Sequence, residues 1–246
     1  MRRTSILALA LLALGATPAA PQGFNLYWDA CGAADGHVQT LFACDANTPP
    51  VSMFASVYPL ASMSQFAAVS VVLDFYIAGG VVPPWWQTAS GQCRQAAIRP
   101  SYHSGDLPDT EECPSIWQGT EAFSVYSVQA IPNDPGGFRF STVAAVPQGS
   151  ELALVADGRQ RVVVRVTVLR SKTVGADACE GCRTGGCIWL QQIDLLSPTE
   201  PRQTLVNAET NAGIGHNAAT YLSSQGTICE VPTVNRTWGA IKTLYR

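Results

Sequence analysis

The strongest constraint on the fold is an alternation of apolar and polar residues that recurs along the chain. It is clearest in the segment RQRVVVRVTVLR at positions 159–170. Successive side chains of a β-strand point to opposite faces, so this period of two predicts a strand with one buried and one solvated face. The buried face is expected to carry Val162, Val164, Val166 and Val168, and the solvated face Arg161, Arg165 and Thr167.

The same alternation occurs in several other segments, separated by proline- and glycine-rich turn sequences. We expect further strands in VSMFASVYP (51–59), FAAVSVVLDFYIA (66–78), EAFSVYSVQAI (121–131), GGFRFSTVAAV (136–146) and CIWLQQIDLL (187–196), with weaker candidates in FNLYWDA (24–30) and QTLVNA (203–208). Two half-apolar sheets bury their apolar faces best against each other. The sequence therefore predicts an all-β protein, an antiparallel β-sandwich of jelly-roll or immunoglobulin-like type.

The first residues resemble a secretory leader. MRR precedes the apolar run TSILALALLALGA and then small residues, which is typical of a signal peptide. We expect a signal peptide at positions 1–20, cut near Ala19, and one secreted domain at positions 21–246. No later segment is long and apolar enough to predict a membrane span. The expected location is secreted or cell-surface, whether periplasmic or extracellular.

The charge balance argues against a nucleic-acid partner. Of 15 basic residues, the leader carries two, which leaves 13 against 18 acidic residues and a net charge of −5. Such a surface repels phosphate backbones. Only 13% of the residues are charged and 47% are hydrophobic, which suits a densely packed extracellular domain.

Eight cysteines in an exported chain most simply form four disulfides. Cys31 with Cys44, and Cys93 with Cys113, each enclose a short loop between β segments, and we favour these local pairs. Each pair would stabilise the fold by about 3 kcal/mol through loop entropy. The remaining cysteines are Cys179, Cys182, Cys187 and Cys229.

Three of these lie in ACEGCRTGGC at positions 178–187, and three interpretations are open. Cys179 and Cys182 could ligate zinc together with Cys187 and either Cys229 or His216, although the usual second closely spaced pair is missing. A redox dithiol needs a helix N-terminus after its CxxC, and here a strand follows. Disulfides are the favoured interpretation, with Cys229 tied to this cluster and anchoring the C-terminal tail.

Catalytic motifs are weak, and we predict no catalytic residue, no metal ligand and no cofactor. His103, Ser104 and Asp106 have the residue types of a hydrolase triad, but the nucleophile-elbow sequence is absent. DTEEC at positions 109–113 contains adjacent acids that a glycosidase would need, a pattern that is more often a solvated loop. His37 and His216 lie in polar loops.

The segment PPWWQ at positions 83–87 is the most specific binding-like feature. Adjacent tryptophans in a strand cannot both face the core, so Trp85 or Trp86 is expected to point outward or into a loop pocket. With Gln87 it could stack a sugar ring and hydrogen-bond the hydroxyls. The interpretation that we favour over this one is that the prolines take the segment out of the strand and both rings cover the sheet edge.

Several motifs together resemble a set of uncharacterised secreted bacterial proteins. They are FNLYWDACGAADG with FACDANT, PPWWQ before GQCRQ, SKTVGADACEGC with the later CI, and the terminal NRTWGAIKTLYR, which matches W-G-x-[IV]-K-x-L-Y-R. The resemblance spans most of the chain. It implies a common cysteine framework and export, without a known activity.

These observations favour a non-enzymatic secreted structural or surface-interaction domain whose partner lies at a surface or outside the cell. A carbohydrate-binding module that uses the tryptophan pair is the alternative, which makes a glycan a candidate partner, and a hydrolase is a third candidate. The tail TWGAIKTLYR at positions 237–246 predicts a short helix, because Trp238, Ile241, Leu244 and Tyr245 share one side. A helix this short must dock on its own domain or on a partner.

Overall fold

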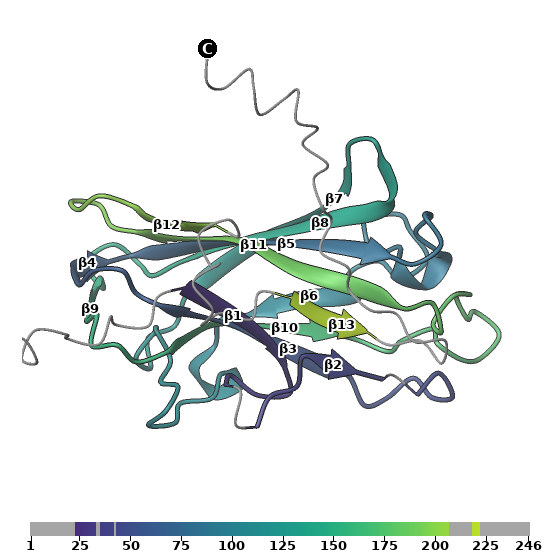
Figure 1. Cartoon of the computed structure of the whole chain (residues 1–246), viewed down its shortest axis with the longest axis horizontal. Coiled ribbons are helices and arrows are strands. Elements are labelled where there is room, and N and C mark those ends of the chain that lie inside the picture. Colours follow the sequence, from purple (N-terminus) through teal and green to yellow (C-terminus); the bar gives the residue numbers. More distant parts are fainter. Residues whose placement is uncertain (1–22, 33–34, 42, 207–217, 222–246) are drawn as a thin grey trace, which may run out of the picture.

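A computed structural model of the 246-residue chain describes residues 23–32, 35–41, 43–206 and 218–221. Its regular structure is almost entirely β-strand, arranged as two facing sheets with a small third sheet at one end (Figure 1). The predicted antiparallel β-sandwich is confirmed. The predicted C-terminal helix lies outside the described residues.

The smaller of the two main sheets has four antiparallel strands in the order β1-β3-β10-β6. Their bounds are β1 Gly23–Trp28, β3 Val51–Tyr58, β10 Arg161–Val168 and β6 Ile98–Ser101. The two central strands are the most regularly alternating segments of the sequence, and every residue of β1 is buried as well. Val164, Val166 and Val168 of β10 face the core as predicted, whereas Val162 is buried on the opposite face of the sheet.

The larger sheet follows the order β2-β13-β11-β5-β8-β7, and β12 also pairs with β11. All of its pairings are antiparallel except that of β2 with β13. The bounds are β2 Gln39–Thr40, β13 Ala218–Tyr221, β11 Gly186–Leu196, β5 Ala68–Ile77, β8 Asp134–Ala145, β7 Phe123–Ile131 and β12 Gln203–Val206. A further two-stranded sheet pairs β4, Met63–Phe66, with β9, Leu152–Leu154.

One side of the sandwich is closed where β1 lies against β13. The indole Nε1 of Trp28, at the end of β1, donates a hydrogen bond to the carbonyl oxygen of Thr220 at 3.2 Å. Trp28 also forms a β-bridge with His37. On the opposite side, β6 and β7 are the outer strands of their respective sheets. The two strands are in contact across the sandwich, and β7 ends the larger sheet on that side.

Arg161 is a correction to the predicted alternation in β10. It was expected on the solvated face, yet it is only 7% exposed. The register of β10 against β3 shifts between Val162 and Val164, so Val163 is an extra residue in a bulge. Residues that precede the bulge therefore point to the opposite face of the sheet from the one that the alternation predicts. Arg161 reaches Asp157 with an N···O distance of 2.9 Å.

The disulfides differ from the predicted local pairs. Neither Cys31–Cys44 nor Cys93–Cys113 exists. The structure instead contains Cys31–Cys113, Cys44–Cys182 and Cys93–Cys179, which join segments 82, 138 and 86 residues apart. Sheet order, and not loop length, decides which cysteines meet.

The pairing settles the three interpretations of the 178–187 segment. Cys179 and Cys182 each bond to a distant cysteine, so they form neither a redox dithiol with each other nor a pair of zinc ligands. Cys187 is disulfide-bonded as well. Cys229, the expected anchor of the tail, lies outside the described residues.

Candidate functional site

The tryptophans of the PPWWQ segment are buried, so the prediction that one of them points outward is wrong. Prolines take the segment out of the sheet and into a 3-10 helix, η1, at Pro84–Trp86. Trp85 and Trp86 are 0% and 1% exposed. Their rings pack edge to face with centroids 4.9 Å apart. The indole N–H groups donate to Thr173 Oγ1 at 3.0 Å and to the Thr184 carbonyl at 3.1 Å.

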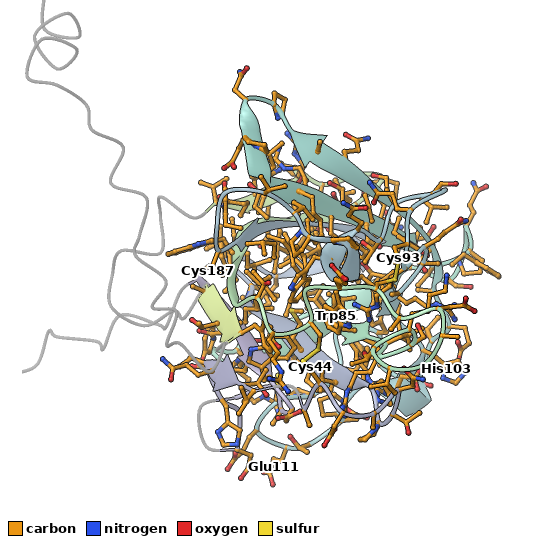
Figure 2. The ribbon with its side chains drawn as sticks, turned by 90° about the vertical axis from the view of Figure 1, so that its right-hand side faces the viewer. Cys44, Trp85, Cys93, His103, Glu111 and Cys187 are labelled. Atoms are coloured by element: carbon orange, nitrogen blue, oxygen red, sulfur yellow. A yellow bond between two sulfur atoms is a disulfide. The ribbon has the colours of Figure 1, made fainter. Side chains whose placement is uncertain are left out.

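These tryptophans organise one end of the sandwich and do not form a binding surface. Figure 2 shows Trp85 in the interior, close to the disulfide-bearing loops, whereas His103 and Glu111 lie at the periphery. Tyr221 packs against both indoles, with centroids 6.5 Å from Trp85 and 5.5 Å from Trp86. Because protein side chains already cover both indole rings, a sugar ring cannot stack on either of them.

The triad-like residues do not form a hydrolase triad. The Nδ1 of His103 accepts a hydrogen bond from the Gly105 N–H at 3.1 Å, and its Nε2 lies 3.2 Å from Glu121 Oε1. Ser104 Oγ also approaches Glu121, at 3.5 Å. Both ring nitrogens of His103 are thus engaged away from the serine hydroxyl, which a catalytic base must contact.

Asp106 and the acidic loop have structural roles. Asp106 accepts a hydrogen bond from Ser101 Oγ at 2.6 Å and lies 3.5 Å from Arg165. In the loop at positions 109–113, Asp109 accepts from the Ser115 N–H at 3.1 Å, and Thr110 Oγ1 accepts from the Cys113 N–H at 3.1 Å. These bonds hold the loop that carries the Cys31–Cys113 disulfide. Glu112 lines a pocket of about 200 Å³ beside that disulfide, together with Asp35.

Gln87 of PPWWQ lines a pocket. The pocket has a volume of about 270 Å³ and lies between the 81–92 loop and the β7–β8 hairpin. Its walls are mostly apolar, and polar groups come from Gln87, Gln92, Gln129 and Asp134. Gln87 Nε2 donates to the Val82 carbonyl at 3.1 Å, which fixes the amide at the pocket wall. A volume near the lower limit of ligand pockets suits only a small molecule.

The most unusual surface of the molecule is strand β7. None of its nine residues is buried, and seven are exposed. Phe123 and Val125 are 75% and 72% exposed, which is rare for large apolar side chains in a regular strand. In Figure 1 the β7–β8 hairpin projects beyond the rest of the sandwich. The sequence predicted this strand but not its exposure.

Apolar residues lie on both faces of β7. Tyr126 and Val128 share the inner face with Thr142 and Phe140 of β8, and the Tyr126 ring stacks on Phe140 with centroids 5.5 Å apart. Phe123 and Val125 lie on the outer face, where Val125 is opposite Val143. The segment FSVYSVQAI contains no charged residue. That absence of charge was the signal in the sequence, although it is equally typical of a strand buried on both faces.

The other described outer strands are protected in ways that β7 is not. The opposite end of the larger sheet is β2, with two residues, and β12 has four. In the smaller sheet β6 has four residues and contains Pro100, and β1 is entirely buried. Short length, proline and burial are the usual means of preventing edge-to-edge pairing. Among the strands that the structure describes, β7 alone is long, uncharged and open.

The described part of the chain contains no group of three or more His, Cys, Asp or Glu side chains arranged to hold a metal ion. Within those same residues no helix has the length and apolar character needed to cross a membrane. A scan against protein-family models and searches of curated proteins and solved structures found no match. The site must therefore be interpreted from its own geometry, and the open edge of β7 is its most distinctive element.

Proposed function

We propose that the protein is an exported, non-enzymatic interaction domain that binds its partner through the free edge of β7. The observation that carries this proposal is the exposure of a nine-residue uncharged strand at the end of a sheet. An open edge offers a row of backbone N–H and C=O groups to another strand, and pairing with it also covers the apolar side chains on both faces.

Export is part of the proposal. The leader-like segment at positions 1–20 predicts it. The three disulfides between described cysteines support it, because such bonds persist in oxidising compartments outside the cytosol. A long, exposed and uncharged edge is an aggregation hazard in any compartment. An edge that stays uncharged despite that hazard is best explained by use.

Site-specific photocrosslinking in cells that export the protein tests the proposal. A photoreactive phenylalanine analogue is placed at Phe123, and a matched control carries it at Val155, which is 51% exposed and lies beyond β9. Both positions are exposed enough to accept the analogue without refolding the core. We expect a discrete crosslinked product from position 123 and none from position 155. Equal products from both positions, or none from position 123, would contradict a binding role for β7.

A second candidate function is the binding of a small neutral polyol in the pocket that Gln87 lines. The observation in its favour is the combination of apolar walls with three side-chain amides. This replaces the predicted sugar platform on Trp85 and Trp86, which their burial excludes. A screen of mono- and disaccharides against the parent protein and Gln87→Leu tests it. Binding that is lost in Gln87→Leu supports it, and no binding by the parent protein removes it.

A further inference from the structure

We infer that the partner of β7 is a second copy of the same chain, paired strand to strand in antiparallel orientation with Ser127 opposite Ser127. This inference rests on the proposed function, since it names the partner that the open edge takes. Three features of the described residues support it: the distribution of free edges, the symmetry of the β7 sequence, and the absence of charge on that strand.

The distribution of edges favours a closed pair of molecules. A head-to-tail arrangement would require β7 of one copy to pair with a different edge of the next. The available described edges are the two-residue β2, the three-residue β9, the four-residue β4, β6 and β12, and the buried β1. None of these matches a nine-residue strand. Two β7 edges match each other, and a two-fold pair uses both completely.

The sequence of β7 is complementary to itself in that arrangement. Two β7 strands overlap over all nine residues only when Ser127 is opposite its copy, and each residue then faces its counterpart counted from the other end. Tyr126 lies opposite Val128 on the inner face, an aromatic and β-branched pair of the kind that stabilises antiparallel sheets. Phe123 lies opposite Ile131, and Val125 opposite Gln129. Each pair joins residues on the same face, so the two sheets continue as one.

Electrostatics favours association of two copies through β7 over association through other parts of their surfaces. The chain carries a net negative charge, so two copies repel at most approaches. Within β7 there is no charge to repel its counterpart. Glu121 precedes the strand and Arg139 lies one strand inward, opposite Gln129. In the paired arrangement neither is directly opposite its own copy.

A single strand pair is a small interface, so association is expected to be weak and best detected by trapping. In Ser127→Cys, the two introduced thiols lie on directly opposite residues, whose Cα atoms are about 4.5–5.5 Å apart in an antiparallel pair. That separation allows a disulfide. The matched control is Ser141→Cys, which is opposite Ser127 on the same face but on β8. Its copy is three strand spacings away, about 14 Å, and out of reach.

The full exported chain is oxidised over a range of protein concentrations and examined on non-reducing gels, with the new bond mapped by mass spectrometry. We expect at least tenfold more disulfide-linked dimer from Ser127→Cys than from Ser141→Cys. Adding Val125→Lys to Ser127→Cys places a charge on a 72% exposed position of the strand and should reduce the trapped dimer to the control level. Melting temperatures of the monomeric fractions, measured with the native disulfides intact, should match that of the parent chain and confirm that the fold is intact.

Equal trapping of both cysteine variants indicates random collision and would overturn the inference, as would no trapping of Ser127→Cys at any concentration. The photocrosslinking experiment separates this failure from that of the proposed function. A product from position 123 with twice the mass of the chain supports the second copy. A product of another mass overturns the second copy while β7 remains a binding edge, and the lack of any product removes both.

Discussion

The guanidinium carbon of Arg94 lies 3.6 Å from the centre of the Trp85 ring. Arg94 is only 2% exposed, and the contacts of its guanidinium group are to carbonyl oxygens: Nη1 donates to Trp85 at 2.5 Å, Nε to Ser171 at 2.9 Å, and Nη2 to Leu169. Burial lowers the pKa of Arg94 to about 9, so the side chain is still charged at neutral pH. One cation thus holds the tryptophan segment to the turn that follows β10.

Replacing Arg94 should weaken the fold substantially. Arg94→Met removes the ring contact and leaves three carbonyls without their donor, one buried and two partly buried, and we expect a loss of about 3 kcal/mol in the free energy of unfolding. Arg94→Lys keeps the charge but not the planar group and should lose about half as much. Chemical denaturation measures both changes. Arg99→Met, on the exposed face of β6, is the control and should change stability by less than about 0.5 kcal/mol.

Removing the Cys93–Cys179 disulfide should also be costly, because it closes a long loop. With the two cysteines 86 positions apart, loop entropy predicts about 4.6 kcal/mol of stabilisation. The paired variant Cys93→Ala with Cys179→Ala avoids free thiols that could exchange. Thermal unfolding of parent and variant should show a large fall in melting temperature, and a change of only one or two degrees would contradict the structural role of this bond.

The ion pair between Asp74 and Arg139 on the outer face of the larger sheet should contribute more than a surface pair. Arg139 Nε and Nη2 lie 2.7 and 2.8 Å from the two oxygens of Asp74, and Asp74 is 2% exposed. Arg139→Gln leaves that carboxylate without its charged partner, at an expected cost of about 2 kcal/mol. The exposed pair of Arg159 and Asp157 is the control, since Arg159→Gln should cost under about 0.5 kcal/mol.

Alkaline pH should unfold the protein through its buried tyrosines. Burial raises the pKa of Tyr221 to about 12, against the opposing attraction of Arg170 and Arg183. Because the folded pKa lies above the unfolded value of 10.0, the folded state holds the proton more tightly. This stabilisation is fully present below pH 10 and is lost as the pH rises through 12. Tyr221→Phe should flatten the fall in stability between pH 10 and 12, and an unchanged slope would contradict this assignment.

Much of the sandwich was predictable because the alternation of apolar and polar residues along a strand indicates which side chains face the core. The alternating valines of β10 and the apolar run of β3 identified the centre of the smaller sheet, and the segments at positions 66–78 and 187–196 identified that of the larger. The short strands β2, β4, β6, β9 and β13 were not predicted. Two to four residues carry too little alternation, and β6 and β13 form because the longer β10 and β11 offer them a pairing edge.

The binding edge and the cysteine pairs depended on information that the sequence does not contain. FSVYSVQAI has the composition of a core strand. Its outer edge is free only because β7 is the last strand of the sheet and pairs with β8 on one side alone. Cys31 meets Cys113 because of the path of the chain across the sandwich. The burial of Trp85 likewise depends on Arg94 and Thr173, which come from other loops. Spacing along the sequence predicts neither the disulfide pairs nor the contacts that bury Trp85.

The disulfide connectivity has a consequence for biosynthesis. A ribosome delivers Cys31 and Cys44 early, whereas the native partner of Cys44 follows 138 residues later. Oxidation in order of appearance would give Cys31–Cys44 and Cys93–Cys113, which are both non-native. Correct maturation therefore requires either that these thiols stay reduced until most of the chain has emerged, or that a thiol–disulfide isomerase reshuffles them afterwards. Recombinant yield should consequently depend on the isomerase capacity of the producing compartment more than on its oxidant.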